Sequence, residues 1–118
     1  MNIRPQLLLA TATDRNYSLM QIPEISPLLA KHCKRFHVKT LDVFGSYSRG
    51  HETPESDLDL LVEFEELPPS QYAQSYFGLL HSIEDELPLQ IDLLTRNSVK
   101  RRSLREAIER EKIRVYET

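Results

Sequence analysis

The chain has 118 residues and a mass of 13.8 kDa, which is the size of one domain. Its 40% hydrophobic and 28% charged residues are typical of a folded soluble protein, which excludes wholesale disorder. A formal net charge of -3 argues against nucleic-acid binding through overall charge. The single cysteine excludes an internal disulfide. No apolar run is long enough to cross a membrane, so we expect a cytoplasmic protein.

Apolar residues at helical spacing begin after Pro23. Ile25, Leu29 and Cys33 fall on one face of the predicted helix, which we expect to be buried. The preceding residues mix apolar and polar types without a clear period. We therefore divide the chain into an N-terminal extension, residues 1–22, and one domain, residues 23–118.

Two strands are predicted next. The run VKTLDVFGS is rich in β-branched and aromatic residues and ends at Gly45. Turn-forming residues around Pro54 separate it from SDLDLLVEFEE, the second predicted strand, which Pro68-Pro69 follows. This pattern predicts two strands joined by a ten-residue turn region.

Helical spacing returns over residues 71–87, and LQIDLLT, residues 89–95, is typical of a third strand. Asn97 or Ser98 is expected to cap a final helix that includes Val99 and Ile108. Three strands with helices covering their apolar faces predict a small α/β (α+β) domain in which helices flank the sheet. A fourth strand could come from either end of the chain.

Acidic residues interrupt the apolar pattern of two of the predicted strands. Side chains two residues apart in a strand share a face, so Asp57 and Asp59 are expected to project together, about 6.6 Å apart. Adjacent carboxylates repel each other, and a divalent cation between them removes that cost. If the third strand pairs beside the second, Asp92 can join them. Such a set predicts a site for two metal ions, as used in phosphoryl or nucleotidyl transfer.

Gly45 and Ser46 stand where the first strand ends. Glycine lets the backbone approach an anion closely, and a serine hydroxyl with nearby N–H groups can bind phosphate oxygens. Arg49 lies one turn further along if a helix starts at Ser46, where it could neutralise phosphate charge. Each feature alone is common, but together they predict a triphosphate site beside the carboxylates.

These residues resemble a known signature. Gly45-Ser46, ten intervening residues and then Asp57-x-Asp59 match the pattern of the DNA polymerase beta-like nucleotidyltransferase superfamily. The stretches GSYSRG, SDLDLLVEF and QIDLLT resemble its small stand-alone members, the minimal nucleotidyltransferases. The resemblance covers about residues 23–112.

The resemblance implies a mixed sheet flanked by helices, with ATP as donor and two magnesium ions as cofactors. By position, it implies that Gly45, Ser46 and Arg49 bind the triphosphate and that three carboxylates hold the metal ions: Asp57, Asp59 and Asp92. It also implies a helical HEPN-domain toxin as partner. In that pairing the nucleotidyltransferase acts as antitoxin by transferring AMP from ATP to a toxin tyrosine.

Two other functions remain open at this stage. The chain could be a non-catalytic subunit that neutralises a partner by covering its active surface. It could also bind RNA through the basic cluster of Lys100, Arg101, Arg102 and Arg105. We favour a solvated helix face for that cluster, because Glu106, Glu109 and Glu111 balance it, and we expect neither nucleic acid nor a membrane as partner.

Overall fold

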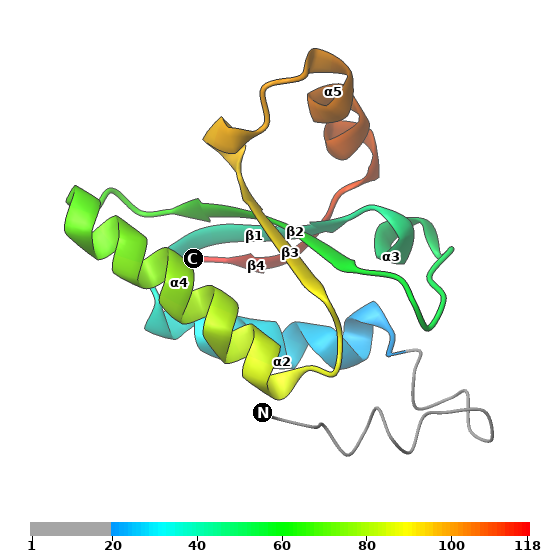
Figure 1. Ribbon diagram of the computed structural model, residues 1–118, viewed down its shortest axis with the longest axis horizontal. Coiled ribbons are helices and arrows are strands. Elements are labelled where there is room, and N and C mark those ends of the chain that lie inside the picture. Colours follow the sequence, from blue (N-terminus) through cyan, green and yellow to red (C-terminus); the bar gives the residue numbers. More distant parts are fainter. Residues whose placement is uncertain (1–19) are drawn as a thin grey trace.

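The computed structural model describes residues 20–118, so nearly all of the predicted extension, residues 1–22, lies outside the described residues. The elements of the described part are, in chain order, α2 (Ile22–Arg35), β1 (Val38–Phe44), α3 (Ser46–Arg49), β2 (Leu58–Phe64), α4 (Pro69–Glu86), β3 (Ile91–Thr95), the 3-10 helix η2 (Arg96–Ser98), α5 (Arg102–Glu111) and β4 (Ile113–Glu117) (Figure 1). None of the helices in this part of the chain is long and apolar enough to span a membrane.

The four strands form one mixed sheet in the order β3-β2-β1-β4. The pair β2–β3 is parallel, and β1 is antiparallel to both of its neighbours. A parallel pair needs a long crossover connection, and α4 provides it. The predicted α/β class with a mixed sheet is confirmed, and the fourth strand comes from the C-terminal end of the chain.

One face of the sheet carries the main core. Side chains alternate along a strand, so Leu58, Leu60 and Val62 of β2 all project to this face, where each is almost completely buried. The helices α2 and α4 cover it, on the opposite side of the sheet from α5 (Figure 1). Ile25, Leu29 and Cys33 of α2 are buried here, as the helical spacing predicts.

The opposite face, which we call the open face, is only partly covered. Phe44, Leu61, Val99 and Ile108 form a second, smaller apolar cluster under α5. The same alternation brings the polar members of β1, β2 and β3 to this face. The fold therefore separates an apolar side, which provides stability, from a side that carries charged residues.

The predicted start of the final helix is wrong. Asn97 and Ser98 belong to η2 rather than to a cap of the last helix, which begins at Arg102. The Ser98 hydroxyl donates a 2.7 Å hydrogen bond to the carbonyl oxygen of Thr95 and accepts one of 3.2 Å from the Thr95 N–H. Ser98 thus closes the short helix η2. Val99, the next residue, is buried in the second cluster, and α5 begins only after it.

An ion pair between a buried carboxylate and a partly exposed arginine fixes the C-terminal strand to the sheet. Asp42, in the middle of β1, is 1% exposed and accepts a hydrogen bond from the Nε of Arg114 on β4. The two residues are register partners across the β1–β4 pair. The Oδ2 atom of Asp42 is buried without a hydrogen-bond partner among the described residues. The carboxylate therefore depends on Arg114 for its compensation.

We predict that Arg114→Ala lowers the free energy of unfolding by about 3 kcal/mol, because it leaves a buried carboxylate unpaired. Urea unfolding followed by circular dichroism measures the loss. Asp42→Asn in the Arg114→Ala background should recover part of it, since the amide carries no charge. Equal stability of Arg114→Ala and the wild type would contradict this role.

Candidate active site

The parallel pairing of β2 with β3 places Asp59 directly opposite Asp92. Both belong to the open face, because their neighbours Leu58, Leu60 and Leu93 are buried in the main core. The sequence predicts this arrangement on condition that the third strand lies beside the second, and the register meets the condition. The central feature of the site is therefore a pair of carboxylates on adjacent strands.

The surroundings of Asp59 disfavour its charged form. The pKa of Asp59 is raised from 3.8 to about 6. Burial is the largest cause, followed by the negative charges of Asp92 and Asp57 and by a side-chain hydrogen bond with Asp92; the positive charge of Arg49 acts in the opposite direction. The charged form of Asp59 is therefore disfavoured, and a cation bound nearby would stabilise it.

Asp57 lies outside the strand to which the sequence assigns it. The strand begins at Leu58, whose N–H donates a 2.8 Å hydrogen bond to the carbonyl oxygen of Gln90. Before it, Thr53 and Ser56 close a turn with a 2.9 Å backbone hydrogen bond. Asp57 is exposed at this junction and lies before the strand, but its negative charge still contributes to the raised pKa of Asp59.

Gly45 provides the space that Asp59 occupies. A Cβ atom at position 45 would lie 2.2 Å from Oδ2 of Asp59, so no other residue type fits. Its φ of 75° and ψ of -152° lie in a region that is essentially restricted to glycine. The backbone then turns into the single-turn helix α3 at Ser46, as the sequence prediction for Arg49 requires.

Arg49 ends α3 and is held by Glu111, a residue that the sequence analysis assigned only to the balance of the basic cluster. Its Nη1 lies 2.9 Å from Oε1 of Glu111, the last residue of α5. The guanidinium is half exposed, and its charge lowers the pKa of Asp59. No local pattern signals this pair, because the two residues are 62 positions apart and meet only when β4 brings the end of α5 to the sheet.

The acidic set suits a hard divalent cation, since it offers carboxylate oxygens whose mutual repulsion a cation would relieve. Among residues 20–118, however, no three acidic, histidine or cysteine side chains already meet around one point. Asp59 and Asp92 are brought together, whereas Asp57 stands at the loop. The three-residue ligand set therefore stays a prediction.

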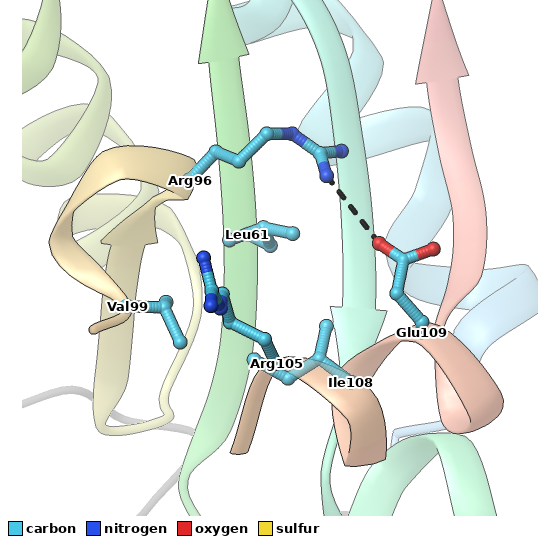
Figure 2. A pocket seen from close by; sticks show the side chains of 6 residues that line it. All are labelled: Leu61, Arg96, Val99, Arg105, Ile108 and Glu109. Atoms are coloured by element: carbon cyan, nitrogen blue, oxygen red, sulfur yellow. Dashed lines mark hydrogen bonds and ion pairs between the residues drawn. The ribbon is translucent and has the colours of Figure 1, made fainter. Parts of the chain in front are cut away.

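A small cavity opens on the same face (Figure 2). It has a volume of about 130 Å³. Its apolar lining comes from Leu61 of β2, from Val99 and from Ile108 of α5. Arg96, Arg105 and Glu109 supply its polar lining, and Arg96 is bound by Glu109 at 3.3 Å. The sequence analysis did not predict this cavity, because its residues come from three separate segments.

The basic cluster at the start of α5 is balanced only in part. Arg102 pairs with Glu106 at 3.3 Å, whereas Glu109 binds Arg96 and Lys112 and Glu111 binds Arg49. Within the described residues, Arg105 takes part in no ion pair. The acidic residues of the helix thus neutralise neighbouring segments as well as the cluster itself.

Comparisons with known proteins agree with the fold and the signature. The family model described as "Nucleotidyltransferase domain" matches residues 26–115. A protein of Methanocaldococcus jannaschii, MJ1379, provisionally named a protein adenylyltransferase, is 37% identical over 98 residues, covering 80% of this chain and 97% of that one. The protein adenylyltransferase MntA of Thermococcus cleftensis is 37% identical over 87 residues, covering 70% and 85%.

The fold also matches a solved structure, the crystal structure of a toxin-antitoxin with AMP-PNP. The TM-score is 0.61 at 19% sequence identity, and the match covers 79% of this chain and 73% of that chain. At this identity the match concerns the fold: the arrangement of sheet and helices is shared.

We predict that Gly45→Ala destabilises the protein by about 3 kcal/mol, through backbone strain and the clash with Asp59. Gly50→Ala is the control for a positive φ without a close neighbour; its ψ of 21° lies in the left-handed helical region, which costs less than the glycine-only region of Gly45. Gly50 also has a positive φ, of 73°, but nothing lies within 4 Å of the place that an alanine methyl group would take there. Its cost should be about 1 kcal/mol, from strain alone. Thermal unfolding of both variants measures the difference, and equal losses would contradict the close packing of Gly45 on Asp59.

We predict that Asp59→Asn stabilises the metal-free protein at neutral pH. Because the folded-state pKa of Asp59, about 6, lies above its ordinary value of 3.8, ionisation of this group costs stability as the pH rises through that window. The amide avoids the cost, so the gain should be on the order of 1–2 kcal/mol at pH 7, after allowance for solvent screening, and should vanish towards pH 4.

Chemical unfolding in the presence of EDTA at several pH values tests this expectation. Asp85→Asn, at an exposed position of α4, is the control for the loss of one negative charge. A pH-independent effect of Asp59→Asn, or a loss of stability at pH 7, would contradict the unfavourable environment of Asp59.

Proposed function

The chain belongs to the nucleotidyltransferase domain family, and from this premise we propose that it transfers AMP from ATP to a tyrosine hydroxyl of a partner toxin, acting as its antitoxin. Relatives named protein adenylyltransferases support the reaction. A toxin-antitoxin of the same fold supports the setting. We further propose that the toxin is of the HEPN type, which rests on the resemblance of the signature.

The observation that carries the proposal is the pairing of Asp59 with Asp92 beside Gly45. Transfer of a nucleotidyl group places negative charge on the oxygens around the attacked phosphorus, and cations held by neighbouring carboxylates neutralise that charge. Asp57, Asp59 and Asp92 would hold two magnesium ions. When bound, these ions would neutralise phosphate charge and make the acceptor hydroxyl more acidic.

Other residues of the chain would bind the phosphates of ATP and accept the proton of the acceptor hydroxyl. Ser46 and the first N–H groups of α3 would bind the terminal phosphates, with Gly45 allowing the close approach. Arg49 would neutralise phosphate charge, and Glu111 holds its guanidinium at the site. Asp92, exposed beside Asp59, would accept the proton of the acceptor hydroxyl.

In the reaction, the phenolic oxygen of tyrosine forms a bond to the α-phosphorus of ATP. The bond between that phosphorus and the bridging oxygen breaks, and its electron pair leaves with pyrophosphate. The phenolic proton passes to a carboxylate of the site and then to solvent. The products are the tyrosyl-AMP diester and pyrophosphate, which balances atoms and charge without a redox partner.

We predict that Asp59→Asn and Asp92→Asn each reduce AMP transfer more than about 100-fold, because each removes a carboxylate that would hold the metal ions neutralising the transition state. Asp85→Asn, on the helix covering the other face, should retain activity. The assay uses α-labelled ATP, magnesium and the protein encoded beside this chain, co-purified with it. Mass spectrometry of the partner should detect added AMP.

The same experiment separates the enzyme from a masking subunit. An unmodified partner that the wild-type chain still inhibits would show neutralisation by covering. Undiminished transfer by both Asp variants would contradict the assignment of the carboxylates. Circular dichroism of each variant controls for folding, and Asp59→Asn is expected to fold at least as stably as the wild type.

A further inference from the structure

The cavity of about 130 Å³ opens on the face of the sheet that carries Asp59 and Asp92, although neither carboxylate lines it. Leu61, one of its lining residues, is two positions beyond Asp59 in β2 and projects to the same face, about 6.6 Å further along the strand. Leu61 is also the register partner of Leu94, which is two positions beyond Asp92. A group held in the cavity is therefore within one side-chain length of both carboxylates.

The direction of the strands places the cavity on the acceptor side of the reaction. Phe44 is the register partner of Asp59, and because β1 runs antiparallel to β2, Gly45 continues away from Leu61. Gly45 and the cavity thus lie at opposite sides of the carboxylate pair, whereas Arg49 is paired with Glu111 of α5, the helix that also lines the cavity. In nucleotidyl transfer the attacking and leaving oxygens are in line across the phosphorus. With pyrophosphate leaving towards Gly45, the attacking oxygen approaches from the cavity.

The size and lining of the cavity favour one aromatic ring. An apolar protein cavity of about 150 Å³ binds benzene, so a cavity slightly smaller accommodates a single six-membered ring more readily than a purine. Leu61, Val99 and Ile108 are buried and provide apolar contacts. The short hydroxyl side chains of serine and threonine would leave this space unfilled.

Arg105 adds an available cation to this apolar lining. Arg96, the other arginine of the cavity, is engaged by Glu109 and lies 3.8 Å from Glu63. Arg105 has no ion-pair partner within the described residues, and its side chain extends between Leu61 and Val99 (Figure 2). A guanidinium against a ring face is favourable, and it also stabilises a developing phenolate.

We infer that this cavity receives the phenol ring of the acceptor tyrosine, presented by the partner chain, and that Arg105 is a specificity-determining residue for it. The inference rests on the proposed function, since it assigns the acceptor side of that reaction. It explains how a chain of this size selects a tyrosine: the ring is recognised by the open face itself. The hydroxyl then points from Leu61 towards Asp59 and Asp92.

Binding of the ring can be measured without catalysis. In the full chain, p-cresol, the side-chain analogue of tyrosine, should shift the methyl NMR signals of Leu61, Val99 and Ile108 in a saturable way. Adenosine and 1-propanol, which represent the donor base and an aliphatic hydroxyl, should leave these signals unchanged. Shifts caused by adenosine instead, or no shift with p-cresol, would overturn the inference.

Variants test the residues one at a time. Val99→Phe should fill the cavity and abolish the p-cresol shifts. Arg105→Glu should weaken p-cresol binding about fivefold, because it removes the cation against the ring. Arg101→Glu is the matched control: it makes the same charge change in an exposed residue that does not line the cavity, so binding should change less than about twofold.

Transfer to the co-purified partner links binding to the reaction. Val99→Phe should slow AMP transfer at least about tenfold while the affinity for ATP is unchanged. If transfer is insensitive to Val99→Phe and Arg105→Glu, the acceptor site lies elsewhere, although the proposed function stands. If the wild type transfers no AMP, the proposed function fails, and the acceptor role of the cavity fails with it.

Discussion

The structure depends on one pairing: the parallel contact of β2 with β3, which brings two acidic side chains together across adjacent strands. Such a contact opposes folding locally, because burial and like charge both raise the pKa of Asp59. The fold tolerates it because the other side of the same strands is almost fully apolar. Leu58, Leu60 and Leu93 pack against α2 and α4 and hold the strands in register. Stability and reactivity are thus carried by opposite sides of one sheet.

The C-terminal segment completes this arrangement. Asp42 and Arg114 fix β4 to β1, and β4 in turn determines where α5 ends. From that end Glu111 reaches Arg49, while Ile108 closes the apolar cluster over Leu61. The last part of the chain therefore builds both sides of the candidate site, although none of its residues belongs to the signature.

Much of the fold follows from local patterns. Alternating apolar residues predict the three strands, and helical spacing predicts α2 and α4, because a side chain's face depends only on its own backbone period. Gly45 and the acidic residues are also singled out in advance, but Asp57 lies before the strand in which it was predicted, and Asp92 meets Asp59 only through the pairing of β2 with β3. What the sequence does not provide is contact between distant segments. Glu111 with Arg49, Arg114 with Asp42 and the cavity around Leu61 all depend on how β4 and α5 return to the sheet. The wrong prediction of a helix cap at Ser98 has a related cause. Ser98 does form capping hydrogen bonds, but they close η2, and α5 begins only after Val99, which is buried in the second cluster.

The ion pair between Arg49 and Glu111 affects which anions can bind at Arg49, according to the charge that each anion carries. The guanidinium of Arg49 already forms an ion pair with the Glu111 carboxylate, so an incoming anion must compete with this carboxylate of the same chain. A singly charged ligand gains little from the exchange, whereas a polyphosphate brings several charges and can engage the guanidinium together with the surrounding N–H groups. For the proposed reaction, Glu111 would thereby favour a triphosphate over a singly charged anion at Arg49, and the ion pair holds the guanidinium at the end of α5.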